Sequence, residues 1–143
     1  MSLSFKNNLI SNDLFIDCSS GISGDMLLSA FLDLGLPKEL LDNSLKIFGL
    51  GTTFNLEINQ DQSYGFRGVR ISVKKIGSFP SVKKWVDIKS LIISSSLSEK
   101  VKQKVLEVFY QLSEAESKVH GCMIEDVHFH EIGSIETLVN IVG

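Results

Sequence analysis

Cysteine, proline and long apolar runs are scarce in this sequence of 143 residues. Its two cysteines, Cys18 and Cys122, are too few for a disulfide framework, and each lies in a context that suits a reduced thiol. No apolar run is long enough to span a membrane, and the N-terminal residues lack the apolar core of a signal peptide. We therefore expect a cytoplasmic protein with no membrane partner, although two cysteines also allow one disulfide.

A surplus of positive charge is missing as well. Fourteen Lys and Arg residues stand against seventeen Asp and Glu residues, which gives a net charge of −3. Proteins that bind nucleic acids or membrane surfaces usually carry basic patches, so the sequence predicts neither kind of partner. Its length suits one domain with a core of its own.

The chain divides into a leader and one domain. Residues 1–12 are expected to form a polar leader, and residues 13–143 are expected to form the domain. Residues 76–84 contain Gly, Pro and Ser and are typical of a linker within it. The sequence stops at Gly143 within an apolar pattern, so we expect the N-terminal part of something longer, with a C-terminal domain outside this sequence.

Apolar spacing indicates an α/β (α+β) fold with a small mixed sheet, an antiparallel hairpin and helices packed on the sheet. Residues 14–18 are apolar as far as Asp17 and predict a short buried strand. Two alternating runs on either side of a turn at 61–65 predict the hairpin. Apolar residues three and four apart predict the helices, at 26–34, 37–48, 87–93, 99–120 and 135–142.

The stretch DCSSGISGDM, residues 17–26, joins the expected strand to the first helix. Its glycines permit backbone conformations closed to other residues, and the helix N-terminus offers free N–H groups. Such a junction can hold a phosphate, or a metal bound by Asp17. A tight turn whose carboxylates only cap backbone amides is the simpler interpretation. The candidate cofactor-binding residues are Gly21, Ser23, Gly24 and Asp25.

A second unusual stretch is His128-Phe129-His130-Glu131. In an extended segment the two histidines point to the same side with Cα atoms about 6.5 Å apart, so that both imidazoles can bind one ion. Neutral imidazole suits zinc, nickel, copper and iron alike. Glu131 can complete the ligand set or act as a base. The sequence therefore predicts metal ligands at His128, His130 and Glu131.

Other reactive side chains have simpler explanations. His120 is expected at the end of a long helix, where the helix dipole favours a cation. Cys18 suits a small buried thiol in a strand, and Arg67 and Arg70 suit a solvated strand face. None of these four is predicted to be a site residue.

Three stretches together resemble the LarC family of nickel-insertion proteins, from about Leu14 to Gly143. That family inserts nickel into pyridinium-3,5-bisthiocarboxylic acid mononucleotide, with CTP hydrolysis and a divalent cation, Mg or Mn. The resemblance covers only the N-terminal part of the family, whose members continue beyond this point. The stretches are DCSSGISGDM at 17–26, LSEKVKQKVLEVFYQLSEAESKVHG at 97–121 and VHFHEIGSIETLVNIVG at 127–143.

The resemblance implies a nickel chelatase, or lyase, in the full-length protein. The cofactor's nickel–carbon bond requires a ring proton to leave, so a base is implied, for which Asp17 and Glu131 are the candidates. In this interpretation Asp17 and the turn at 21–25 share one pocket with His128, His130 and Glu131. The CTP-binding part is expected in the missing C-terminal region, so the fragment alone should be inactive. The oligomeric state, a homo-oligomer included, stays open.

The chain departs from the family at some positions. Many members carry a histidine-rich run where this chain has residues 77–84, so nickel storage by that loop is not supported. The family usually has Asp at the positions of Glu136 and Asn140, and the change at Asn140 weakens a ligand role for the last helix. Two alternatives therefore stay open: a non-catalytic nickel-binding or delivery module, and a phosphate- or nucleotide-binding domain.

Overall fold

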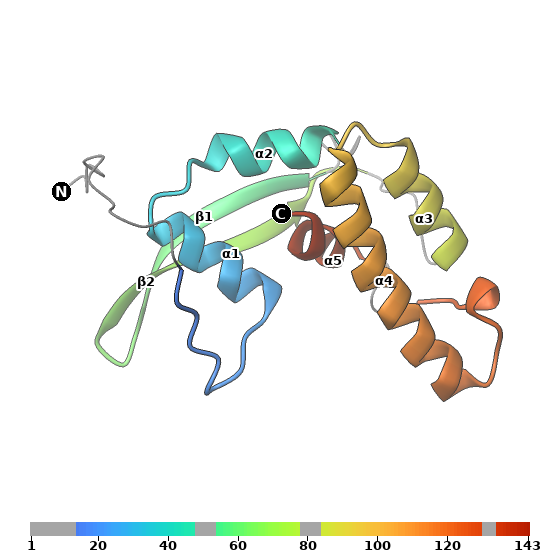
Figure 1. Ribbon diagram of the computed structural model, residues 1–143. Helices are drawn as coiled ribbons and strands as arrows, with labels where there is room; N and C mark the ends of the chain where they lie inside the picture. The colour runs from blue at the N-terminus through green and yellow to red at the C-terminus, as the bar shows by residue number, and fades with distance from the viewer. Residues whose placement is uncertain (1–13, 48–53, 78–83, 130–133) are drawn as a thin grey trace.

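The computed structural model describes residues 14–47, 54–77, 84–129 and 134–143. This described part holds five α-helices, a two-stranded antiparallel sheet and a short 3-10 helix, which confirms the α+β class and the predicted helices. None of its helices is long and apolar enough to cross a membrane. The elements are α1 (Gly24–Asp33), α2 (Lys38–Ile47), β1 (Phe54–Ser63), β2 (Phe66–Lys75), α3 (Trp85–Ser94), α4 (Glu99–His120), η1 (Ile124–Asp126) and α5 (Ile135–Val142) (Figure 1).

The hairpin has a tighter turn than the sequence indicates. Tyr64 and Gly65 alone join the strands, with φ angles of 50° and 84°. Positive φ at both central positions is typical of a type I′ turn, whose twist matches that of the strands it joins. The alternating runs at 54–58 and 69–73 lie opposite each other in this register, as the sequence predicts.

Helix α1 lies along β2. The Ser29 hydroxyl oxygen accepts a hydrogen bond from the backbone N–H of Ile71 at 3.1 Å, and Asp33 pairs with Arg67 at 3.5 Å. An edge strand presents N–H groups that its partner strand does not use, and such groups need another acceptor. Helix α1 supplies one, so its position on the hairpin is set by a specific bond as well as by packing.

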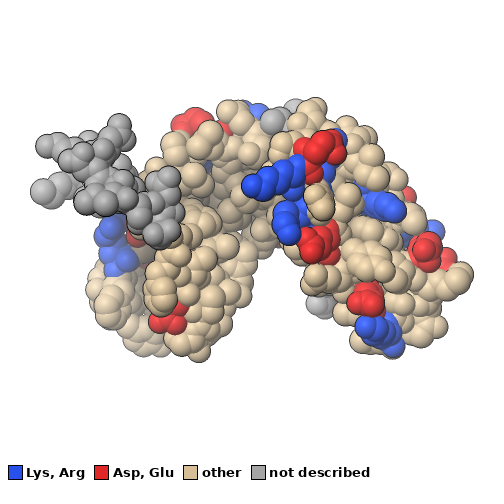
Figure 2. Space-filling view, viewed as in Figure 1, with Lys and Arg blue, Asp and Glu red and all other residues tan. Residues whose placement is uncertain are grey.

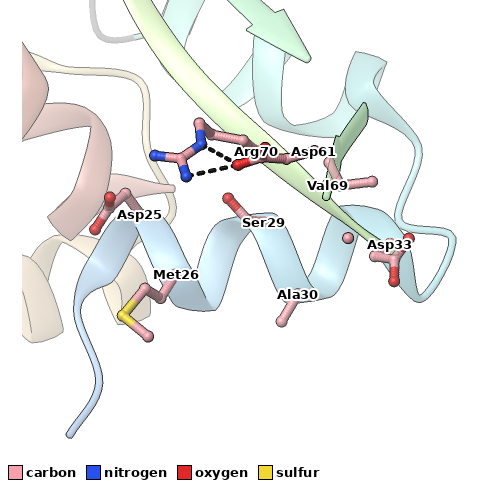
Figure 3. Close-up of a pocket in the computed structure, with 9 residues that line it drawn as sticks. Asp25, Met26, Ser29, Ala30, Asp33, Asp61, Val69 and Arg70 are labelled. Atoms are coloured by element: carbon pink, nitrogen blue, oxygen red, sulfur yellow. Dashed lines mark hydrogen bonds and ion pairs between the residues drawn. The ribbon is translucent and has the colours of Figure 1, made fainter. Parts of the chain in front are cut away.

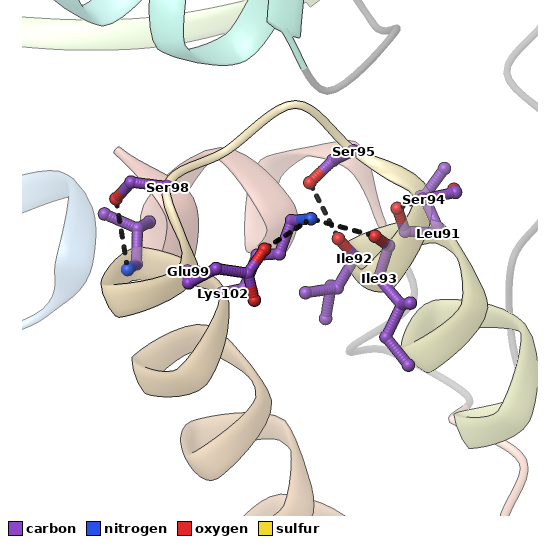
Figure 4. Close-up of polar contacts among 9 residues, drawn as sticks. Leu91, Ile92, Ile93, Ser94, Ser95, Ser98, Glu99 and Lys102 are labelled. Carbon is purple, nitrogen blue, oxygen red and sulfur yellow. Dashed lines mark hydrogen bonds and ion pairs between the residues drawn. The ribbon is translucent and has the colours of Figure 1, made fainter.

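Helices α3 and α4 are joined by a short turn held by polar contacts (Figure 4). Ser98 caps α4, since its hydroxyl oxygen accepts a hydrogen bond from the N–H of Val101. Lys102 reaches back to donate to the carbonyl of Ile93 at 3.0 Å and pairs with Glu99 at 3.1 Å. The Lys102 side chain is only 15% exposed, so its ammonium group bonds within this turn and has little contact with solvent.

Helix α5 connects the elements around the hairpin with the long helix α4. It packs against α1, α2 and β2 on one side and against α4 on the other (Figure 1). Leu138 and Val139 of α5 are fully buried, and side chains from most of the other elements complete one hydrophobic core around them. The other large, fully buried side chains are Phe109, Phe129, Leu45, Leu56, Ile88 and Ile92.

The predicted buried strand at 14–18 is wrong. The segment belongs to no strand, and Phe15 is 91% exposed. The hairpin is the only sheet in the described part of the chain, so that sheet is antiparallel and not mixed. A short apolar run shows that a segment can be buried, but not that a neighbouring strand is present to pair with it. The leader at 1–12 and most of the linker at 76–84 lie outside the described residues.

Candidate functional site

The loop before α1 holds Asp17 as an exposed carboxylate. One carboxylate oxygen accepts a hydrogen bond from the backbone N–H of Ser19 at 2.9 Å. This bond, with a smaller contribution from the Ser19 hydroxyl, lowers the pKa of Asp17 below its ordinary value. A carboxylate with a lowered pKa is a weaker base, and the role of Asp17 as a catalytic base stays a prediction.

Two predicted cofactor-binding residues have structural reasons to be glycine. Gly21 has a φ of 83°, and its N–H donates to the carbonyl of Cys18 at 2.9 Å to close a turn. Gly24 lies against α5, where an added Cβ would be 2.7 Å from the Cβ of Asn140. Turn formation and packing therefore explain both glycines, while their part in binding a cofactor stays a prediction.

The contact at Gly24 brings together two stretches that the sequence analysis singled out. The stretch 17–26 leads into α1, the stretch 127–143 ends in α5, and these helices approach each other where Gly24 meets Asn140. Ser23 occupies the N-cap position of α1, but its hydroxyl donates to Asp25 instead of capping the helix. The last helix therefore meets the glycine turn.

A pocket of about 340 Å³ lies between α1 and the hairpin, with Asp25 at one end and Asp33 at the other (Figure 3). Arg70 of β2 also lines it, and its Nε donates to Asp61 Oδ2 at 2.6 Å. The lining carries three carboxylates and one guanidinium. Asp61 pairs with Arg70 and Asp33 pairs with Arg67, so Asp25 is the lining carboxylate without an arginine partner in the described structure. This charge balance favours a cationic ligand over a phosphate. Arg70 lies on a solvated strand face, as expected, with its side chain 71% exposed, and it forms an ion pair there with Asp61.

Replacing Arg70 by glutamine is expected to raise the pKa of Asp61 toward its ordinary value. That pKa is lowered by hydrogen bonding to Arg70 first and to the Gln62 N–H second. A lowered carboxyl pKa adds stability above the unfolded-state pKa, and this stability is lost as the pH falls through the folded-state pKa. The variant should therefore lose less stability on acidification, which NMR titration and urea unfolding can follow.

The control for this prediction is Arg67→Gln. Arg67 pairs with Asp33 at 3.5 Å, whereas Asp61 pairs with Arg70, so the titration of Asp61 should stay as in the parent chain. An unchanged Asp61 titration in the Arg70 variant would show that the ion pair does not persist in solution.

The segment that contains His128 is extended, as the sequence predicts. His128 forms an isolated antiparallel bridge with Lys84, and the neighbouring Phe129 is fully buried while His128 faces solvent. By this alternation His130 is expected on the same side as His128. His130 and Glu131 lie outside the described residues, so the ligand set His128, His130 and Glu131 stays a prediction.

His128 lines a small pocket of about 190 Å³ with three other side chains of ligand type, His120, Cys122 and Asp126. We call it the α4-end pocket. His120 Nε2 also pairs with Glu116 at 3.1 Å. No three His, Cys, Asp or Glu side chains in the described ranges are placed to hold a metal ion. The described residues of this pocket therefore bring ligand-type side chains near one another but do not by themselves form a metal site.

The neighbours of His128 do not follow from residue spacing. The sequence predicts a helix end for His120 and no site role for Cys122. The signal lay in Gly121, which ends α4 in a left-handed conformation with a φ of 64° and turns the chain back. That reversal lets the residues on either side of Gly121 line one pocket with the segment at 126–128.

Asp17 and His128 line different pockets in the described structure. Asp17 lines a groove along α1, whereas His128 lines the α4-end pocket, and the two share no lining residue. Figure 1 shows the loop before α1 and the turn after α4 well apart. The shared pocket expected from the sequence is therefore not formed by the described residues. Residue spacing indicates which side chains are on one face of a segment, but not which distant segments meet.

Known proteins resemble this chain over nearly all of its length. The family described as nickel insertion protein matches residues 14–143. One relative, from Clostridium kluyveri, is 40% identical over 141 residues, which cover 91% of this chain and 35% of the relative. Another, from Akkermansia muciniphila, is 41% identical over 137 residues, which cover 91% and 34%. Both are named pyridinium-3,5-bisthiocarboxylic acid mononucleotide nickel insertion protein.

The match covers the whole described structure but a limited part of each relative. The chain spans about a third of the length of the curated relatives it matches. No solved structure matches it. Because the family match includes the glycine turn, the long helix and the histidine segment in one alignment, the chain belongs to the family of nickel insertion proteins.

Proposed function

We propose that this chain forms part of an enzyme that inserts nickel into pyridinium-3,5-bisthiocarboxylic acid mononucleotide. The names of two relatives support this substrate, and the match over residues 14–143 connects them to this chain. The observation that carries the proposal is that His128 lies beside His120 and Cys122 in the α4-end pocket. CTP and a divalent cation, Mg or Mn, belong to the proposal through the resemblance to the LarC family.

Nickel is the substrate metal in this proposal, and each residue has a distinct part. Neutral imidazoles of His128 and His130 donate nitrogen lone pairs to the ion, and nickel accepts such ligands well. Formation of the nickel–carbon bond releases a proton from the ring carbon, which a carboxylate must accept. We assign that base to Glu131 because it follows His130 directly. Asp17, in another pocket and with a lowered pKa, is assigned to substrate binding with Gly21 and Ser23.

Replacing both His128 and His130 by alanine is expected to abolish nickel binding to the chain. Metal binding requires deprotonated ligands, and the ordinary pKa of imidazole is about 6.5, so the affinity of the parent chain should fall as the pH drops below that value. Isothermal titration with nickel measures both effects. Undiminished affinity in the double variant would place the ligands elsewhere and return the histidine segment to a structural role.

The two cysteines provide a matched control. Cys122 lines the α4-end pocket beside His128, whereas Cys18 is exposed in the loop before α1. Cys122→Ala should weaken nickel binding, and Cys18→Ala should leave it as in the parent chain. Equal effects of the two substitutions would mean that the α4-end pocket is not where nickel binds.

The alternative is a nickel-binding module that delivers the ion to a separate catalytic part. The limited share of the relatives that this chain covers favours it for the chain on its own. A delivery module binds nickel without the mononucleotide and shows no metallation when CTP and magnesium are added. A phosphate-binding domain would bind the mononucleotide without nickel. Spectroscopic detection of the nickel–carbon product from the chain alone would establish the enzyme without a further domain.

A further inference from the structure

An apolar groove of about 290 Å³ runs between the loop before α1 and helix α1 itself. We call it the α1 groove. Its lining is almost entirely apolar, and Asp17 is the only charged residue in it. Phe15 is 91% exposed, and five other large apolar residues of the lining are between 45% and 56% exposed. The exposed apolar residues are Leu14, Phe15, Ile16, Ile22, Met26 and Leu34.

The exposure of this groove is unusual for a folded domain. Single exposed apolar side chains are common, but a contiguous apolar patch marks an interaction surface. In Figure 2 the surface over the loop and α1 carries little charge, whereas acidic and basic side chains crowd over α4. Other exposed apolar side chains, such as Phe66 and Val119, lie on other elements, whereas the six of the groove line one hollow together.

The backbone beside the groove is also without a partner. In the described part of the molecule, residues 14–16 form no strand, and no backbone–backbone hydrogen bond joins them to another segment. Their composition nevertheless predicts a buried strand. An apolar segment with unpaired N–H and C=O groups can receive an added strand, because backbone bonds supply affinity and neighbouring pockets receive side chains.

The length of the relatives indicates which partner covers this surface. The chain matches about a third of each relative, so full-length members carry about twice as much polypeptide again. We propose that the α1 groove is the docking surface for this remaining part, which contributes an apolar strand that pairs with residues 14–16 and places side chains against Met26 and Leu34. The inference rests on family membership and does not involve the nickel ligands proposed above. It shares Asp17 and Gly21 with the proposed substrate-binding residues, so the added strand and the substrate meet at this end of the groove.

Cys18 is a natural reporter for the test, since it is exposed and directly follows Asp17. The experiment uses a Cys122→Ser chain and follows the alkylation of Cys18 by N-ethylmaleimide with mass spectrometry. The rate is measured with and without a second polypeptide, which carries the part of the Clostridium kluyveri relative that this chain does not match. We expect the alkylation rate to fall about tenfold when nine-tenths of the chain is bound. Phe15→Ser should abolish this protection, whereas Phe66→Ser, at a side chain that is 80% exposed on the hairpin, should retain it.

Hydrogen exchange in the full-length Clostridium kluyveri relative provides a second measurement that does not depend on the separate polypeptide folding. The segment that matches residues 14–22 should exchange slowly there and rapidly in the present chain. Rapid exchange in both proteins would overturn the proposal. Alkylation of Cys18 that slows with rising concentration of the chain alone would also overturn it, because a second copy would then cover the groove.

Discussion

Phe129→Ala is expected to lower the free energy of unfolding by about 3–5 kcal/mol, the usual cost of removing a fully buried aromatic ring. Phe129 is completely buried, and its ring meets that of Phe109 in an edge-to-face contact with centroids 6.4 Å apart. Truncation leaves a cavity that α4 and the extended segment cannot close without moving. The free energy lost with the buried apolar ring and the free-energy cost of the cavity therefore add. Urea unfolding of both proteins measures the difference.

The matched control is Phe66→Ala, the same substitution at a side chain that is 80% exposed on the hairpin. Its effect should stay within about 0.5 kcal/mol, since surface substitutions lose few contacts. The Phe129 variant should also bind nickel more weakly if it remains folded, because this ring anchors the segment that carries His128. Equal stabilities of the two variants would contradict the burial of Phe129.

Gly24→Ala is expected to destabilise the protein by about 1–3 kcal/mol, as overpacking of a close contact does. The added Cβ would be 2.7 Å from the Cβ of Asn140 and 3.2 Å from its backbone carbonyl oxygen. Neither neighbour is the flexible end of a side chain, so α1 and α5 must separate. Alanine has a higher helix propensity than glycine, and this gain offsets part of the loss.

Two further variants separate the cost of the close contact at Gly24 from other effects of adding a methyl group. Gly68→Ala adds the same methyl group where no atom lies within 4 Å and the backbone needs no positive φ, so it should be near neutral. Asn140→Gly removes the closest contact, so the Gly24 substitution should cost less in that background. An equal cost in both backgrounds, measured by urea unfolding, would show that the helices do not meet at Gly24.

The family and the local elements follow from the sequence alone. Ser98 and Gly121 mark the two ends of α4, and the alternating runs around Tyr64 and Gly65 form the hairpin. These features depend on residues within a few positions of one another, through capping bonds, side-chain period and turn conformation. The resemblance to nickel insertion proteins likewise rests on ordered motifs, and the family match confirms it.

The partners of these elements are decided only in the tertiary structure. Residues 14–18 have the composition of a buried strand but no strand beside them, and Gly24 is a close-packing residue because α5, over a hundred positions later, lies against it. In the same way His120 and Cys122 lie beside His128, while Asp17 lines another groove. Local sequence patterns constrain each segment separately. The approach of distant segments depends instead on how α5 packs between α1, α2, β2 and α4, and no local pattern encodes that packing.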